Sequence, residues 1–183
     1  MTRIFLFQID AFTDRPFAGN PAAVCLLSEF KDDRWLQAVG QEMNLSETAF
    51  LLKEGDGYRL RWFTPKVEVD LCGHATLASA HVLWAEGHVS ADNPILFHTK
   101  SGLLKAARKE ALIELDFPTK PPVASSPPFG LLDALAVAAK YVGVGGDYRH
   151  CRIRCPYPCR PQVVRGVCNM GIVGMKSTAQ GAC

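Results

Sequence analysis

Apolar and polar residues follow one another along the chain in short patterns that predict strands and a few helices. Residues Ile4–Ile9 are apolar on both faces, which is typical of a strand buried inside a sheet. Tyr58–Phe63 alternates Tyr, Leu and Trp with two arginines and predicts a half-buried strand. Five more strands are predicted at Ala22–Leu27, Ala49–Leu52, Ile95–Thr99, Leu103–Arg108 and Ala111–Phe117. Short strands with few parallel strand–helix–strand signals indicate an α+β fold.

One helix is predicted to be buried on most of its sides. Within Ala75–Ala85 nearly every side chain is small or apolar, and the three polar residues there form no continuous stripe. Gly87 is placed to end this helix as its C′ residue. Because such a helix must be covered, we expect the other elements to wrap around it. Two amphipathic helices are also predicted, one capped by Asp32 or Asp33 and ending near Met43, the other at Leu131–Val142.

The chain has 183 residues, of which 48% are hydrophobic, and its formal net charge is +2. This length is sufficient for one good hydrophobic core or two small ones. The near-neutral charge gives no overall support for nucleic-acid binding. No stretch of 18 apolar residues is present, and the first residues lack the pattern of a signal peptide. We therefore expect a cytoplasmic protein without a membrane partner.

The last part of the chain differs in composition from the rest. Residues 144–183 carry six basic residues against one acidic residue, and five of the seven cysteines lie in the last 33 residues. Pro118–Phe129 contains five prolines in twelve residues and is expected to be a linker that continues neither strand nor helix. Zinc binding in the tail is an alternative, although the spacing of its potential ligands is unusual for zinc: His150, Cys151, Cys155 and Cys159.

Two segments carry candidate chemistry. Cys72, Gly73 and His74 form a turn at the start of the buried helix, where backbone N–H groups lack intrahelical partners and are suited to binding a carboxylate or phosphate. An ordinary strand-to-helix turn is the alternative. Glu47 lies between a predicted helix and a predicted strand, where a partly buried carboxylate can exchange protons near neutral pH. A solvated surface carboxylate is the alternative at that position.

Four motifs occur in order along the chain: DAFTDRPFAGNPAAV (Asp10–Val24), MNLSETAFL (Met43–Leu51), RWFTP (Arg61–Pro65) and DLCGHATLA (Asp70–Ala78). Together they resemble the phenazine-biosynthesis (PhzF-like) isomerase family over about residues 3–143. The resemblance implies a diaminopimelate-epimerase-like fold, in which each of two similar domains is a curved mixed sheet around a central helix. It also implies an active site between the two domains.

The resemblance further implies roles for individual residues. Glu47 is expected to be the acid/base that moves a proton on a small carboxylate-bearing substrate, without a metal, flavin or nucleotide cofactor. Gly73 and His74 are expected to bind that substrate, with His74 helping in proton transfer or orientation. Cys72 falls where related epimerases carry a catalytic cysteine, and we expect a small buried residue, with a catalytic thiol as the alternative. A homodimer is one option for the assembly.

The end of the chain departs from the family pattern. The second domain of the family continues further and supplies a Gly/Thr/Ser-rich loop with an Asp, and neither is found after about Val142. We therefore expect a first domain at 1–117, a linker at 118–129, the start of a truncated second domain at 130–143, and an atypical Cys/Arg-rich tail at 144–183 that a frameshift or wrong splicing would produce. Two functions follow as hypotheses: a cofactor-independent isomerase or epimerase impaired by this loss, or a catalytically silent homologue acting as a binding or interaction domain.

Overall fold

The computed structural model describes the chain in eight segments: residues 4–13, 17–109, 112–118, 123–136, 139–145, 148–153, 165–166 and 168–170. The chain forms two compact units, the first comprising Met1–Phe117 with Val164–Cys183 and the second Pro118–Val163. Each unit contains its own sheet. Among the described residues, no helix combines the length and the apolar character needed to cross a membrane.

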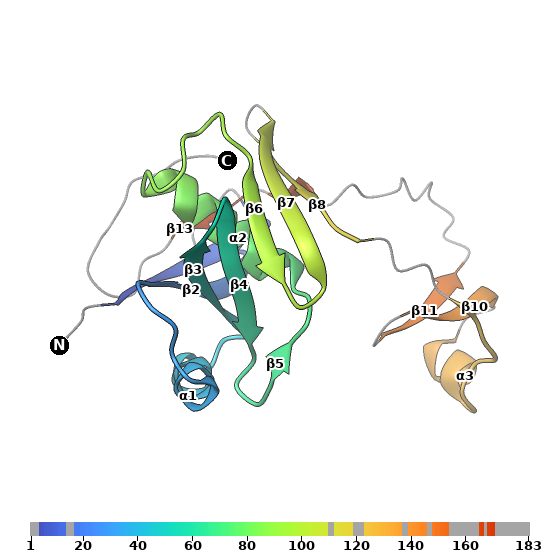
Figure 1. The fold of residues 1–183 in the computed structure, drawn as a ribbon. Coiled ribbons are helices and arrows are strands. Elements are labelled where there is room, and N and C mark those ends of the chain that lie inside the picture. The colour runs from blue at the N-terminus through green and yellow to red at the C-terminus, as the bar shows by residue number, and fades with distance from the viewer. Residues whose placement is uncertain are drawn as a thin grey trace. The chain divides into compact units, whose positions relative to one another are not determined.

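The first unit contains a mixed sheet of ten strands (Figure 1). β2–β3 and β4–β6 are parallel pairs, and the other pairs are antiparallel. The seven strands predicted from the sequence are all present, with ends shifted by at most two residues. In spatial order the strands are β12 (Arg165–Gly166), β8 (Leu112–Asp116), β7 (Gly102–Lys109), β6 (Ile95–Thr99), β4 (Gly57–Phe63), β3 (Glu47–Glu54), β2 (Asn20–Leu27), β1 (Phe5–Ala11) and β13 (Cys168–Met170), with β5 (Glu68–Val69) paired to β4.

The sheet curls until its two ends approach each other. β12 pairs with β8 and β13 pairs with β1, although Gly166 and Cys168 are only two residues apart in the chain. A chain spans at most about 3.6 Å per residue, so β12 and β13 must lie close together. Their partner strands, β8 and β1, are the two ends of the rest of the sheet and are therefore also near each other. The sheet therefore has an inner and an outer face, as expected for the curved mixed sheet that the family resemblance implies.

Helix α2 (Gly73–Ala85) occupies the inside of the curved sheet (Figure 1). All eleven residues from His74 to Trp84 are buried, as expected for a helix that is apolar on most sides. Thr76 and Ser79 satisfy their buried hydroxyls by donating to carbonyl oxygens four residues earlier, at 2.5 and 2.7 Å. Gly87 follows the helix with a φ of 72°, the left-handed conformation predicted for the C′ residue. The predicted central helix is confirmed.

Helix α1 (Asp33–Met43) packs against β3 and β4 and confirms the predicted amphipathic helix. Asp32 caps it by accepting a hydrogen bond from the Trp35 backbone N–H at 2.8 Å. Asn44 ends it in the left-handed conformation. The helix contributes to a second apolar cluster, distinct from the core around α2, whose buried members are Cys25, Leu36, Phe50 and Phe63.

The second unit contains β9 (Val123–Ala124), α3 (Leu131–Leu135), β10 (Ala139–Gly145) and β11 (Tyr148–Ile153), and its three strands form an antiparallel sheet in the order β11-β10-β9. The predicted helix Leu131–Val142 is wrong beyond Leu135, because α3 ends at Ala136 in the left-handed conformation and β10 follows. No residue of α3 is buried, so no core contact favours a longer helix. Tyr and Val residues in β10 instead favour a strand.

The proline-rich segment also contains a strand, contrary to the prediction. In β9, Val123 and Ala124 retain the backbone N–H groups that the flanking prolines lack. This strand pairs with β10, and the backbone N–H of Ser125 donates to the Val142 carbonyl oxygen at 3.0 Å. The partner strand therefore decides the conformation of these residues, against the preference of the local sequence.

Most of the tail expected at residues 144–183 lies outside the described residues. Its described parts contribute β11 to the second unit and β12 and β13 to the first. Cys155 and Cys159, two ligands of the zinc alternative in the tail, lie outside the described residues. The expected domain boundaries and the origin of the tail stay predictions.

Candidate active site

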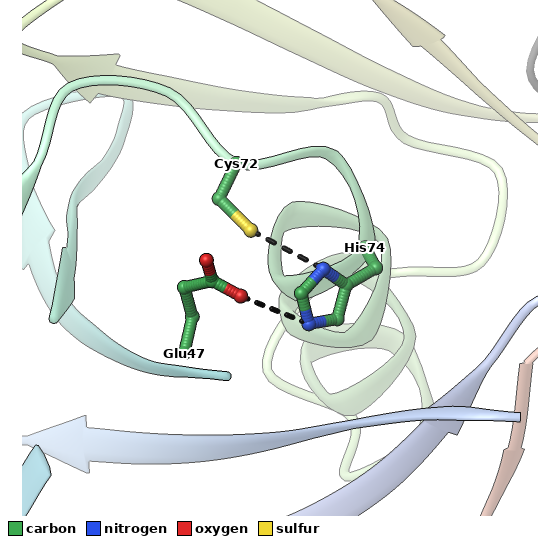
Figure 2. A group of neighbouring side chains, drawn as sticks. All are labelled: Glu47, Cys72 and His74. Carbon is green, nitrogen blue, oxygen red and sulfur yellow. Dashed lines mark hydrogen bonds and ion pairs between the residues drawn. The ribbon is translucent and has the colours of Figure 1, made fainter. Parts of the chain in front are cut away.

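Three side chains from separate segments meet at the N-terminus of α2 (Figure 2). Glu47 is the first residue of β3, Cys72 immediately precedes α2, and His74 lies in the first turn of α2. Glu47 Oε2 and His74 Nε2 are 3.3 Å apart, and Cys72 Sγ lies 3.4 Å from His74 Nδ1. The structure thus brings together two residues, Glu47 and His74, that the sequence places 27 positions apart.

The path of the chain through the sheet explains the position of Glu47. β2 and β3 are parallel neighbours connected through α1, and Ala22 of β2 lies opposite Glu47 in the register. The Ser46 hydroxyl donates to Asn20 Oδ1 at 3.4 Å, which links the start of β3 to the start of β2. Helix α2 packs against these two strands. Its first turn is thereby held beside the first residue of β3.

The contact between Glu47 and His74 is largely shielded from solvent. The His74 side chain is 9% exposed and the Glu47 side chain 19%. Glu47 Oε2 and His74 Nε2 are themselves buried, yet neither makes a hydrogen bond of good geometry with another described group. Buried polar atoms in folded proteins are normally hydrogen-bonded. Two unsatisfied atoms side by side mark this place as a candidate ligand site.

Burial determines the protonation of the two neighbours of Glu47. It lowers the pKa of His74 below the ordinary value, against the opposing effects of the Glu47 charge and the Pro21 backbone. Burial, with a further contribution from Glu47, raises the pKa of Cys72 to about 12. At neutral pH, His74 is therefore a neutral imidazole and Cys72 a thiol.

Cys72 Sγ and His74 Nδ1 are in hydrogen-bond contact, and the tautomer of the ring decides which of them donates. In the tautomer with the proton on Nε2, that N–H faces the Glu47 carboxylate and the Cys72 S–H donates to Nδ1. The buried, protonated Cys72 fits the expectation of a small buried residue. The contact between Cys72 and His74 was not predicted from the sequence. The available signal was that only one residue separates this Cys from this His at the start of a helix.

Gly73 begins α2 and leaves the backbone there accessible. A Cβ atom added at Gly73 would have Phe117 Cε2 as its nearest neighbour, at the ordinary van der Waals distance of 3.7 Å. The fold itself therefore has room for a methyl group at this position. No side chain caps α2 by a hydrogen bond, so the N–H groups of its first turn retain the capacity to bind an anion.

A cavity of about 730 Å³ elsewhere in the first unit is a weaker candidate. It is lined in part by Arg59, Arg61 and Lys100. Arg59 forms an ion pair with Glu54 at 2.6 Å, and Glu68 pairs with both Arg61 and Lys100, at 2.7 and 2.5 Å. Because these cationic groups already have carboxylate partners, the cavity offers less for an incoming ligand than the site in Figure 2.

Comparison with known proteins gives consistent matches. The pattern of the family described as phenazine biosynthesis-like protein matches residues 9–139. The chain is 57% identical over 139 residues to a protein of Halalkalibacterium halodurans named an uncharacterized isomerase, covering 75% of this chain and 52% of that protein. A PhzF family structure from Enterococcus faecalis has a TM-score of 0.67 and 41% identity, covering 76% of this chain and 54% of that chain.

The likeness in fold extends further than the likeness in sequence. A Pseudomonas aeruginosa structure described as a predicted epimerase has a TM-score of 0.64 at 24% identity, and it supports the expected α+β, epimerase-like fold. The chain spans about half the length of the curated relatives that it matches. The family match covers most of the first unit and includes Glu47, Cys72, Gly73 and His74. This chain therefore belongs to the phenazine biosynthesis-like (PhzC-PhzF) family.

Proposed function

We propose that this chain provides one half of an active site that isomerises or epimerises a small carboxylate-bearing metabolite without a cofactor. Glu47 takes a proton from a carbon atom of the substrate, and the proton is returned at another atom or from the opposite face. The observation that carries the proposal is the shielded contact between Glu47 and His74 at the N-terminus of α2. A base, a hydrogen-bond donor and an anion site are adjacent there.

The first turn of α2 is suited to hold the carboxylate of the substrate. Its N–H groups lack a capping side chain, and the helix dipole favours a negative charge at this end. Gly73 allows a ligand to approach the backbone without meeting a side chain. A carboxylate bound at Gly73 and His74 would place the adjoining carbon close to Glu47, as proton transfer requires.

His74 is proposed to assist Glu47 through its Nε2–H group. A neutral imidazole donates one hydrogen bond without adding a positive charge, so it can orient the Glu47 carboxylate. In this role the ring carries its proton on Nε2, and Nδ1 accepts a hydrogen bond from the Cys72 thiol. The name isomerase of the relative in Halalkalibacterium halodurans supports the same reaction class.

Replacing Glu47 by glutamine tests the role of its carboxylate. Glu47→Gln keeps the size of the side chain and removes the proton acceptor. We expect it to reduce deuterium incorporation from D₂O into a turned-over carboxylate substrate by at least about 10²-fold, the usual contribution of a positioned acid/base. The measurement is mass spectrometry of a panel of small carboxylates after incubation with the chain, alone and joined to the C-terminal half of a relative.

Glu42→Gln is the matched control, because Glu42 is an exposed residue of α1. It should leave deuterium incorporation unchanged, and circular dichroism should show both variants folded. Normal exchange in Glu47→Gln would refute the role of Glu47. Carboxylate binding without any exchange, in the chain and in the joined form, would instead favour the catalytically silent binding domain.

A further inference from the structure

Glu47, Cys72 and His74 have a chemistry that proton transfer does not use. Each offers one ligand atom, a carboxylate oxygen, a sulfur or a ring nitrogen, and these atoms all lie within 4.8 Å of one another. Figure 2 shows the carboxylate and the sulfur turned toward the imidazole ring from two sides. We propose that these three side chains form a Zn²⁺-binding site.

The spacing of the ligand atoms is close to that of a tetrahedral zinc site. Zinc binds sulfur at about 2.3 Å, nitrogen at about 2.0 Å and oxygen at about 2.1 Å, which places ligand atoms about 3.3–3.8 Å apart. Glu47 Oε2 and His74 Nε2 are already 3.3 Å apart. Cys72 Sγ contacts the other ring nitrogen, Nδ1, at 3.4 Å, so it must turn toward Nε2 for one ion to bind all three side chains. The ligand atoms are at most 4.8 Å apart, so a movement of about 1 Å brings them within the range of about 3.3–3.8 Å of a zinc site. Rotation of the side chains is sufficient for such a movement.

Two of the ligand groups contain buried atoms without hydrogen-bond partners. Glu47 Oε2 and His74 Nε2 are both buried and unsatisfied, and the His74 side chain is 91% buried. A metal ion at this point would supply the missing partner to both groups. Such satisfaction of buried polar atoms is the feature that separates a built site from a chance cluster of surface residues.

The donor set selects zinc among the common divalent cations. Thiolate and imidazole are ligands that zinc prefers, whereas Mg²⁺ and Ca²⁺ require oxygen ligands. As Zn²⁺ binds, Cys72 releases its thiol proton to solvent and the sulfur becomes an anionic ligand, and His74 binds through Nε2 with its single ring proton on Nδ1. Glu47 and Cys72 then neutralise the charge of the ion. With three protein ligands, the fourth position is left to a water molecule.

Occupation by zinc makes the site unavailable for proton transfer. Glu47 and His74 would both be coordinated, so zinc acts at this position as an inhibitor. The inhibition by zinc rests on the proposed function, but the binding of Zn²⁺ to the three side chains does not. Zinc affinity is measured on the chain directly, and its outcome is independent of any turnover.

The test uses Zn²⁺ alone and Co²⁺ alone as probes. The purified full chain, freed of metal with a chelator and desalted, is titrated with Zn²⁺ in competition with a chromophoric chelator. Co²⁺ reports a thiolate ligand by a charge-transfer absorption and tetrahedral geometry by intense visible bands. Tail thiols are removed as competitors by alanine replacement at Cys151, Cys155, Cys159, Cys168 and Cys183. We expect one Zn²⁺ per chain and the thiolate band in this background.

Substitutions locate the bound metal. Cys72→Ser, His74→Gln and Glu47→Gln should each lower Zn²⁺ affinity at least tenfold, and Cys72→Ser should abolish the thiolate–cobalt band. Cys25→Ala is the matched control, since Cys25 is also a buried free cysteine but lies in the second apolar cluster. Circular dichroism without metal establishes that each variant is folded.

Two results would overturn the proposal. One is loss of zinc binding on replacement of the five tail cysteines, which would locate the metal in the tail. The other is equal Zn²⁺ affinity in Cys72→Ser and Cys25→Ala. This second comparison is also made in the unaltered chain, so it holds even where the replaced tail affects folding.

Discussion

At the scale of single residues, the site at the start of α2 keeps features that folding alone does not require. Glu47 Oε2 and His74 Nε2 are buried and lie 3.3 Å apart, yet neither has a hydrogen bond of good geometry. Gly73 occupies a position where the fold has room for a methyl group. Both features have a physical reason if a ligand binds here, because a ligand supplies hydrogen-bond partners and requires close access to the backbone.

A comparison of alanine substitutions at Gly57 and Gly73 tests whether Gly73 is present for ligand access rather than for folding. A Cβ atom at Gly57 would lie 2.4 Å from the Leu96 carbonyl oxygen, so Gly57→Ala must displace backbone and should lower the free energy of unfolding by about 1–3 kcal/mol. Gly73→Ala should change it by less than about 0.5 kcal/mol, yet reduce deuterium incorporation because the methyl group obstructs the substrate. Urea denaturation measures both variants. Equal destabilisation would assign Gly73 a structural role instead.

At the scale of elements, α2 is the helix around which the first unit is built. It packs against β1, β2, β3 and β8, and its two buried hydroxyls are satisfied within the helix. Besides His74, the buried stretch of α2 contains a second histidine, His81, which is 6% exposed. Burial, with a smaller effect of the positive charge of Arg108, lowers the pKa of His81 to about 4. The core therefore contains a histidine that folding keeps neutral.

His81 should make the first unit less stable in mild acid. At pH values between the ordinary pKa of 6.5 and the folded pKa of about 4, the unfolded chain binds a proton at His81 that the folded chain does not. The free energy of unfolding therefore decreases as the pH is lowered through this range. From about pH 7 to about pH 5 this loss is on the order of 2 kcal/mol. His81→Gln should remove that part of the pH dependence. Urea denaturation of both proteins at the two pH values measures it, and an unchanged decline in the variant would contradict the assignment.

At the scale of the whole molecule, the described site is built from one unit. Glu47, Cys72 and His74 all belong to the first unit, and the chain spans about half the length of the curated relatives that it matches. Proton transfer gains about 7–11 kcal/mol from positioning when both walls of a site hold the substrate and exclude water. We expect a substrate held by one wall alone to be positioned less firmly and to stay more accessible to water.

Joining this chain to the C-terminal half of a relative should therefore raise the activity. We expect the 183-residue chain by itself to be inactive or nearly so, and a chimera that joins its first 139 residues to the C-terminal half of the Halalkalibacterium halodurans relative to incorporate deuterium at least about 10²-fold faster. Both proteins are assayed with the same carboxylate panel. Equal rates would mean that residues 140–183 already supply a working second wall.

The sequence by itself determined the elements whose signals are local. Apolar runs and, at Tyr58–Phe63, period-two alternation located seven strands to within two residues. The nearly all-apolar run at residues 75–85 predicted a helix buried on most sides, since such a surface cannot remain in water. Asp32 and Gly87 marked helix ends through hydrogen-bonding and backbone preferences that depend on the residue itself.

Only the tertiary structure decided which distant residues meet. The contact of Glu47 with His74 depends on the parallel pairing of β2 and β3 and on the packing of α2 against them, and no local pattern encodes either. Burial in that packing makes His74 neutral and Cys72 a thiol. β10 likewise forms through its pairing with β9 and β11. Helical periodicity predicted a helix over part of β10, since backbone pairing between distant segments leaves no trace in a local sequence pattern.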